Sequence, residues 1–297
     1  MTASRYIPRS WSRNDWTGAH FVGLVLLTAL GFWAAFDAWR DIFYIAKRDE
    51  ESSHAFLVPI VIGWLFWVRR GRVRHCRPVG LWIGPALCLL GWFMYSVGDT
   101  HLMQSIWHLG AILLVVGCML SFLGTQVLRA FLPVFLALVF LIPVPGRIRQ
   151  RVAIPLQRTT AAVTEAAFRL ADEPVTRSGN LLSINGVDVA VAEACNGMRM
   201  LFALGMVSYA FAFGTPLRGY ARVLVLIATP VSAVLCNVIR LLPTVWVYGN
   251  YSEEFARGFH DISGWVMLMV AFGLLMAVLQ LLRWAMVPVA PFTLAYD

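Results

Sequence analysis

Charged residues are scarce in this sequence. Asp, Glu, Lys and Arg make up 13% of the 297 residues, whereas a soluble globular chain carries about 25%. The hydrophobic fraction is 59% and the mean hydropathy is +0.71. This shortage of charge excludes an ordinary soluble domain and indicates a chain that is partly embedded in a lipid bilayer. The net charge of +8 does not indicate nucleic acid binding, because the basic residues stand in short runs between apolar stretches, as topology anchors do.

The cysteines lack any spacing typical of a disulfide framework or of a metal site. None belongs to a C-x-x-C motif, so no zinc site, metal or cofactor is expected. A signal peptide is also missing: the first apolar stretch follows three arginines but has no A-x-A cleavage site, and it is expected to remain as the first helix. The cysteines to be judged singly are Cys76, Cys88, Cys118, Cys195 and Cys236.

Apolar runs recur along the whole chain. They are long enough, or nearly so, to cross about 30 Å of hydrocarbon. Most of the Lys and Arg residues of the short loops fall on one side if the N-terminus is cytoplasmic, which predicts that both termini are cytoplasmic. We therefore expect an all-α polytopic membrane protein with about eight transmembrane helices, forming a single domain over residues 1–297. The expected spans are 18–38, 55–68, 79–97, 105–123, 127–144, 195–213, 221–242 and 262–282.

The long external segment 145–194 has an organisation of its own. Residues 147–171 alternate basic and apolar side chains at helical spacing, which predicts an amphipathic helix in the membrane interface, although a solvated connector stays open. Two short apolar runs then flank Asn185-Gly186, a pair that accepts the positive φ angles of a type I′ turn. A small β-hairpin is therefore expected directly before the sixth predicted helix, 195–213.

This topology brings three reactive residue types to one bilayer depth. Cys195 opens the sixth predicted helix on the outer face, Arg240 stands near the outer end of the seventh, and His260 stands at the mouth of the eighth. Each has a plain alternative role. The cysteine can be a small core residue, the arginine can snorkel to the headgroups, and the histidine can be an interface residue. Cys236, one turn deeper than Arg240, is the rival nucleophile.

The neighbours of these residues favour chemistry. A cysteine in the first turn of a helix, with Arg199 one turn further along, is favoured as a thiolate. Arg240 can hold that thiolate or stabilise an oxyanion, and Asn237 stands where it can support the guanidinium. His260 can exchange a proton near neutral pH. Cysteine with histidine is the recurring pair of acyl-transfer enzymes.

Four stretches of the sequence resemble the exosortase/archaeosortase family of membrane cysteine transpeptidases. They are Ser-His-Ala-Phe-Leu-Val-Pro at 53–59, Ala-Glu-Ala-Cys-Asn-Gly-Met-Arg at 192–199, Cys-Asn-Val-Ile-Arg at 236–240, and Phe-His-Asp-Ile-Ser-Gly-Trp at 259–265. The resemblance covers roughly residues 50–283. It departs from the commonest pattern at Asn196, where Ser is more usual, and at Pro243, where an unbroken helix is typical.

The resemblance implies a catalytic trio. Cys195 matches the family's nucleophile, Arg240 its essential partner and His260 its acid/base residue, while Arg199 and His54 fall on matching positions. The implied substrates are secreted proteins whose C-terminal sorting signal has a Pro-Glu-Pro-like motif, one transmembrane helix and a basic tail. Cleavage at the periplasmic face of the inner membrane would leave an acyl-enzyme for a surface acceptor of unknown identity.

Three basic residues of the external segment are candidates for binding that signal. We expect Arg147, Arg149 and Arg151 to contact the acidic residue of the motif, because charge-assisted pairs favour arginine.

Two other functions stay open. One is a non-enzymatic transporter or assembly factor for surface polysaccharide, and the other is an acyltransferase that uses His260 with a lipid donor. A transporter is expected to show inverted repeats or polar residues at the midplane, whereas here the polar residues gather at the outer rim. Replacing Cys195 separates the cysteine enzyme from the other two, because only that enzyme depends on it, and replacing His260 identifies the acyltransferase.

Overall fold

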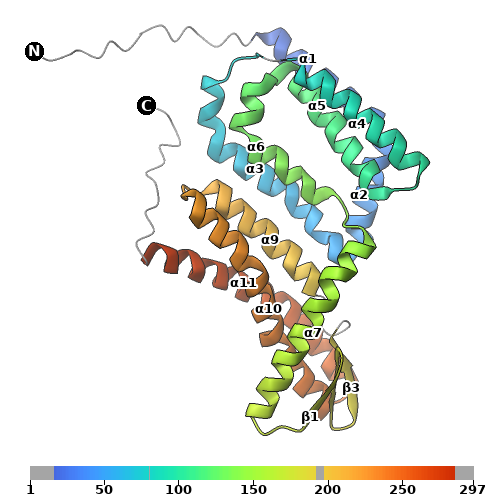
Figure 1. Ribbon diagram of the computed structural model, residues 1–297, viewed down its shortest axis with the longest axis vertical. Coiled ribbons are helices and arrows are strands. Elements are labelled where there is room, and N and C mark those ends of the chain that lie inside the picture. The colour runs from blue at the N-terminus through green and yellow to red at the C-terminus, as the bar shows by residue number, and fades with distance from the viewer. Residues whose placement is uncertain (1–16, 80, 192–196, 285–297) are drawn as a thin grey trace, which may run out of the picture. The chain divides into compact units, whose positions relative to one another are not determined.

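The computed structural model describes residues 17–79, 81–191 and 197–284. These residues are mostly helical, with one small sheet (Figure 1). They divide into two compact units. One is built from residues 17–39 and 68–135, and the other from 40–67 and 136–284. The chain passes from one unit to the other within α2 (Phe36–Arg48), within α3 (Val58–Arg69) and within α6 (Leu132–Ala137).

The first unit is held together by close approach of helix backbones. Its remaining elements are α1 (Gly18–Ala34), η2 (Arg70–His75), α4 (Ile83–Thr100) and α5 (Gln104–Ala130). Helices α4 and α5 run side by side (Figure 1). A Cβ on Gly91 would lie 2.5 Å from the backbone nitrogen of Leu114, and one on Gly117 would lie 2.6 Å from that of Cys88. Small residues that let backbones meet in this way are the usual basis of helix pairing in membranes.

The second unit contains the C-terminal helices and the sheet. Its helical elements, besides the parts of α2, α3 and α6, are η1 (Glu50–Leu57), η3 (Leu138–Leu141), α7 (Gly146–Leu170), α9 (Gly197–Gly214), α10 (Gly219–Asn250) and α11 (Glu253–Trp284). Helix α10 packs against α9, α11 and α7. Its inner face joins Leu204 of α9 and Met267 of α11 in one apolar cluster with Ala233 and Cys236. Pro243 does not interrupt α10.

The sheet has three antiparallel strands in the order β1 (Val175–Ser178), β2 (Leu181–Ile184) and β3 (Val187–Ala190). Asn185 and Gly186 join β2 to β3 with φ angles of 50° and 79°, the positive values that a type I′ turn requires. The sequence predicted two strands around this turn. The structure adds β1, which pairs with β2 and contacts α7.

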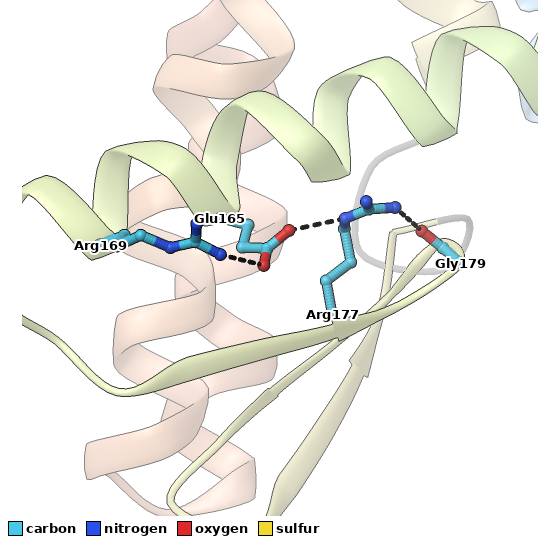
Figure 2. A network of polar contacts seen from close by, with 4 residues as sticks. All are labelled: Glu165, Arg169, Arg177 and Gly179. Carbon is cyan, nitrogen blue, oxygen red and sulfur yellow. Dashed lines mark hydrogen bonds and ion pairs between the residues drawn. The ribbon is translucent and has the colours of Figure 1, made fainter.

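A charge network connects β1 to α7 (Figure 2). The Glu165 carboxylate accepts from Arg177 Nε at 2.7 Å and from Arg169 Nη2 at 2.9 Å. Arg177 Nη1 donates in turn to the carbonyl oxygen of Gly179 at 2.9 Å. Because one carboxylate joins a strand residue to a helix residue, the network fixes the sheet on the second half of α7.

The sheet also packs on the last turns of α10. Leu182 and Ile184 are fully buried and form an apolar cluster with Leu241 and Val245 of α10. Asn185 Nδ2 donates to the carbonyl oxygen of Gly249 at 3.2 Å. The sheet is therefore anchored on the same helix that carries Arg240.

Three helical segments are long and apolar enough to cross a membrane among the described residues: Ser52–His75, Gln104–Ala130 and Gly219–Asn250. Two bent pairs add to these if each counts as one span. They are α1 with α2, bent by 71°, and Leu132–Leu141 with α7, bent by 90°. These helices make the chain a multi-pass membrane protein. The total of eight spans stays a prediction.

Candidate functional site

Arg240 and His260 meet across the contact between α10 and α11. The Nη2 atom of Arg240 lies 2.9 Å from Nε2 of His260 and donates also to the His260 carbonyl oxygen at 3.4 Å. Both side chains are half-buried. Two residues of the predicted trio, twenty positions apart in the sequence, are thus in direct contact.

Ser263 completes this contact, although it was not among the predicted site residues. Its Oγ donates to the His260 carbonyl oxygen at 2.7 Å and accepts from Arg240 Nε at 3.3 Å. Its spacing of three residues from His260 puts both on one face of α11. The spacing can be read from the sequence, but only the structure shows that Arg240 contacts both residues.

Asn237 and Cys236 are buried one turn before Arg240. Asn237 is 1% exposed, and its Oδ1 has no hydrogen-bond partner among the described residues. Among the described residues the Arg240 guanidinium contacts His260 and Ser263, so the expected support from Asn237 is not seen there and stays a prediction. Cys236 is 0% exposed within the apolar cluster of α9, α10 and α11. That enclosure keeps the rival thiol away from water.

Cys195 and Asn196 lie outside the described residues. Arg199 belongs to the first turn of α9, but its side chain also lies outside the description.

His54 reaches α9 from the N-terminal part of the second unit. The imidazole is 9% exposed and stacks on the ring of Phe202, with centroids 5.0 Å apart and planes inclined by 19°. His54 also lines a small pocket between α2, η1 and η3. The other lining residues include Ile42, Ala46, Ser52, Phe140 and Pro143.

The three arginines that open α7 differ in their surroundings. Arg149 Nη1 lies 3.4 Å from Asp49 Oδ2, which also accepts from Ser52 Oγ at 2.8 Å. Arg147 and Arg151 are exposed. The first turns of α7 thus present cationic side chains, one of which already pairs with a carboxylate of the chain itself.

Metal ligands are not gathered anywhere in the described part of the chain: no group of three or more His, Cys, Asp or Glu side chains lies close enough together to hold an ion. The polar contacts around Arg240 involve a cation, an imidazole and a hydroxyl. These groups can move a proton and stabilise an anion.

The chain is similar to a known protein family. No curated protein and no solved structure matches the chain. A family model described as transmembrane exosortase matches residues 39–277, a range that includes Arg240, His260 and Ser263. The chain therefore belongs to the transmembrane exosortase family.

Proposed function

We propose that this chain is a membrane cysteine endopeptidase and transpeptidase that cleaves the C-terminal sorting signal of secreted proteins. Family membership supports a sorting protease or transpeptidase in general. The observation that carries the finer proposal is the 2.9 Å contact between Arg240 Nη2 and His260 Nε2. It joins a fixed cation to a proton-exchanging group at one point of the molecule.

Cys195 is the proposed nucleophile, and the described residues on both sides of it support this choice. Val191 is fully buried in the cluster that contains Leu241, the residue after Arg240. On the other side, Leu204 belongs to the cluster that contains Cys236, one turn before Arg240. Val191 before Cys195 and Leu204 after it therefore share apolar clusters with the two turns of α10 that flank Arg240.

The reaction proceeds by acyl transfer. The Cys195 thiol gives its proton to His260, the resulting thiolate attacks the scissile carbonyl carbon, and Arg240 donates to the oxyanion that forms. Collapse of the tetrahedral intermediate breaks the carbon–nitrogen bond, and the leaving amine takes a proton from His260. The thioester is then attacked by a nucleophile of the surface acceptor or by water, which releases the thiol.

The substrate class follows from the resemblance and from charge. The proposed substrates carry a Pro-Glu-Pro-like motif, a transmembrane helix and a basic tail. Arg147, Arg149 and Arg151 contact the acidic residue of the motif, because guanidinium groups pair well with carboxylates. Arg199, Asn196, Asn237 and His54 are assigned supporting roles around the nucleophile.

Location and topology complete the proposal. The eight-span chain crosses the bacterial inner membrane with both termini in the cytoplasm. The segment 145–194 and the catalytic trio then face the periplasm, within one domain over 1–297. Cleavage on that side suits a substrate whose folded part has already been secreted.

Processing of a reporter in cells tests the proposal. The reporter is a secreted protein ending in the motif, an apolar helix and an arginine cluster, and its cleavage is followed by a change in mass. We expect Cys195→Ala, Arg240→Ala and His260→Ala each to abolish cleavage, and the matched variant Cys236→Ala to retain it. Normal cleavage by Cys195→Ala overturns the proposal. A transporter would tolerate that change, and an acyltransferase would lose function only with His260.

A further inference from the structure

The hydrogen bond between Arg240 and His260 restricts where the imidazole carries its proton. A guanidinium has only donors and stays charged in proteins. The imidazole nitrogen that faces Arg240 Nη2 at 2.9 Å must therefore accept. His260 Nε2 is then unprotonated, and the neutral ring carries its proton on Nδ1.

Ser263 determines how the guanidinium meets the imidazole. Arg240 Nε donates to Ser263 Oγ, and Nη2 donates to His260. These two nitrogens lie on the same edge of the planar guanidinium, so two contacts fix both its position and its plane. A single contact would leave the group free to rotate.

The Ser263 hydroxyl accepts from Arg240 because its own proton is already donated to another acceptor. Ser263 has one O–H, and it donates to the His260 carbonyl oxygen at 2.7 Å. Its lone pairs are left to accept from Arg240. The residue is 8% exposed, which limits replacement of its hydroxyl by water. We propose that Ser263 is a positioning residue that aims Arg240 at Nε2 of His260 and so fixes the Nδ1-protonated form of the imidazole.

This inference rests on the proposed function for its catalytic meaning. While Arg240 donates to Nε2, that nitrogen cannot take a proton from the Cys195 thiol. Arg240 has to turn from Nε2 toward the developing oxyanion, and Nε2 then accepts the proton that later goes to the leaving amine. Ser263 accepts a hydrogen bond from Arg240 Nε, and this contact keeps the guanidinium within reach of both His260 and the oxyanion.

Nitrogen NMR of the full chain in lipid nanodiscs measures the proton position directly. The histidines are labelled with ¹⁵N, and the signals of His260 are assigned by their loss in His260→Gln. At a pH where the imidazoles are neutral, we expect Nδ1 to be protonated and Nε2 to be an acceptor. Ser263→Ala should move His260 largely to the Nε2-protonated form that free imidazole side chains prefer. Ser263→Thr, which keeps the hydroxyl, should leave the wild-type form.

A second variant covers the case in which Ser263→Ala fails to fold. Arg240→Met removes the donor that faces Nε2 of His260, and it should show the same change of the proton position. A wild-type His260 protonated at Nε2 overturns the inference. So does an unchanged spectrum in Ser263→Ala or in Arg240→Met.

Cleavage of the reporter provides the catalytic measurement. Loss of one hydrogen bond in Ser263→Ala should lower kcat by roughly three- to tenfold with KM little changed, and Ser263→Thr should restore it. If Cys195→Ala still cleaves, the proposed function fails, whereas the NMR result on His260 stands by itself. If Cys195→Ala is inactive but Ser263→Ala matches the wild type in rate and spectrum, only the role of Ser263 is wrong.

Discussion

Ile184 of β2 lies directly against Gly249 in the last turn of α10. A Cβ added to Gly249 would come 2.7 Å from Cγ2 of Ile184, closer than van der Waals contact allows. Asn185 next to it donates to the Gly249 carbonyl oxygen at 3.2 Å. The sheet and the helix that carries Arg240 are therefore coupled at this point, and a change there should reach the site.

Gly249→Ala should destabilise the second unit. The helix itself gains up to about 1 kcal/mol from the substitution, but the clash with Ile184 costs about 1–3 kcal/mol. We expect a net loss of thermal stability in detergent, together with slower reporter cleavage. The measurement is the unfolding midpoint of the purified full chain.

Two variants test whether the clash is the cause. Gly258→Ala in α11 is the matched control, because a Cβ there meets no atom within 4 Å, and it should not destabilise. In an Ile184→Ala background, the cost of Gly249→Ala should shrink, because the clashing atoms are gone. An equal cost in both backgrounds would contradict the packing argument.

Gly91→Ala should damage the first unit more severely. Its Cβ would meet the backbone nitrogen of Leu114 at 2.5 Å, and backbone cannot rotate away as the end of a side chain can. We expect α4 and α5 to separate at a cost of several kcal/mol, measured as a fall in the yield of folded chain. Gly63→Ala in α3, with open space around its Cβ, should be tolerated. Equal yields of the two variants would contradict this account of α4 and α5.

The fold was predictable where the hydrophobic pattern determines it. Hydropathy identifies the helices, because lipid requires every backbone polar group to be satisfied within its own segment. The turn residues Asn185 and Gly186 indicated strands on either side of them. Strand β1 was not foreseen, because Val175–Ser178 lacks the alternation that marks a strand. It pairs with β2, and Arg177 also ties it to Glu165 of α7.

The site was predictable only in its residue types. An arginine near a helix end and a histidine beyond it indicated chemistry because such groups are costly near lipid. Their partners depend on side-chain direction, which spacing does not give. Asn237 stood at the right interval from Arg240, yet the guanidinium bonds to Ser263 on another helix. The Oδ1 of Asn237 has no partner among the described residues.

The Cys76 thiol should react slowly with alkylating reagents. Burial raises its pKa above the ordinary value, and the positive charge of Arg72 opposes this only in part. Because only the thiolate reacts, alkylation should require a higher pH than for a free cysteine. In a variant whose only cysteine is Cys76, Arg72→Ala should raise the pKa further and slow labelling again at a given pH. Faster labelling in Arg72→Ala would show that exposure, not charge, controls this thiol.

Asp49→Asn should strengthen binding of an acidic sorting signal. The Asp49 carboxylate lies 3.4 Å from Arg149 Nη1, at a partly exposed position, so it competes with any substrate carboxylate for that guanidinium. Removing the charge keeps an oxygen for Ser52 but weakens the hold on Arg149. An exposed ion pair contributes up to about 1 kcal/mol. KM for the reporter should therefore fall by up to about fivefold, with kcat little changed.

The substrate supplies the control for this competition. A reporter with Gln in place of the acidic residue of its motif carries no competing carboxylate, so Asp49→Asn should leave its KM unchanged. Adding Arg149→Met to Asp49→Asn should remove the gain for the acidic reporter, because the shared partner is gone. If KM falls equally for the acidic and the Gln reporters, Asp49 acts on the shape of the pocket near Ser52 and His54. The role of Arg149 in reading the signal would then be wrong.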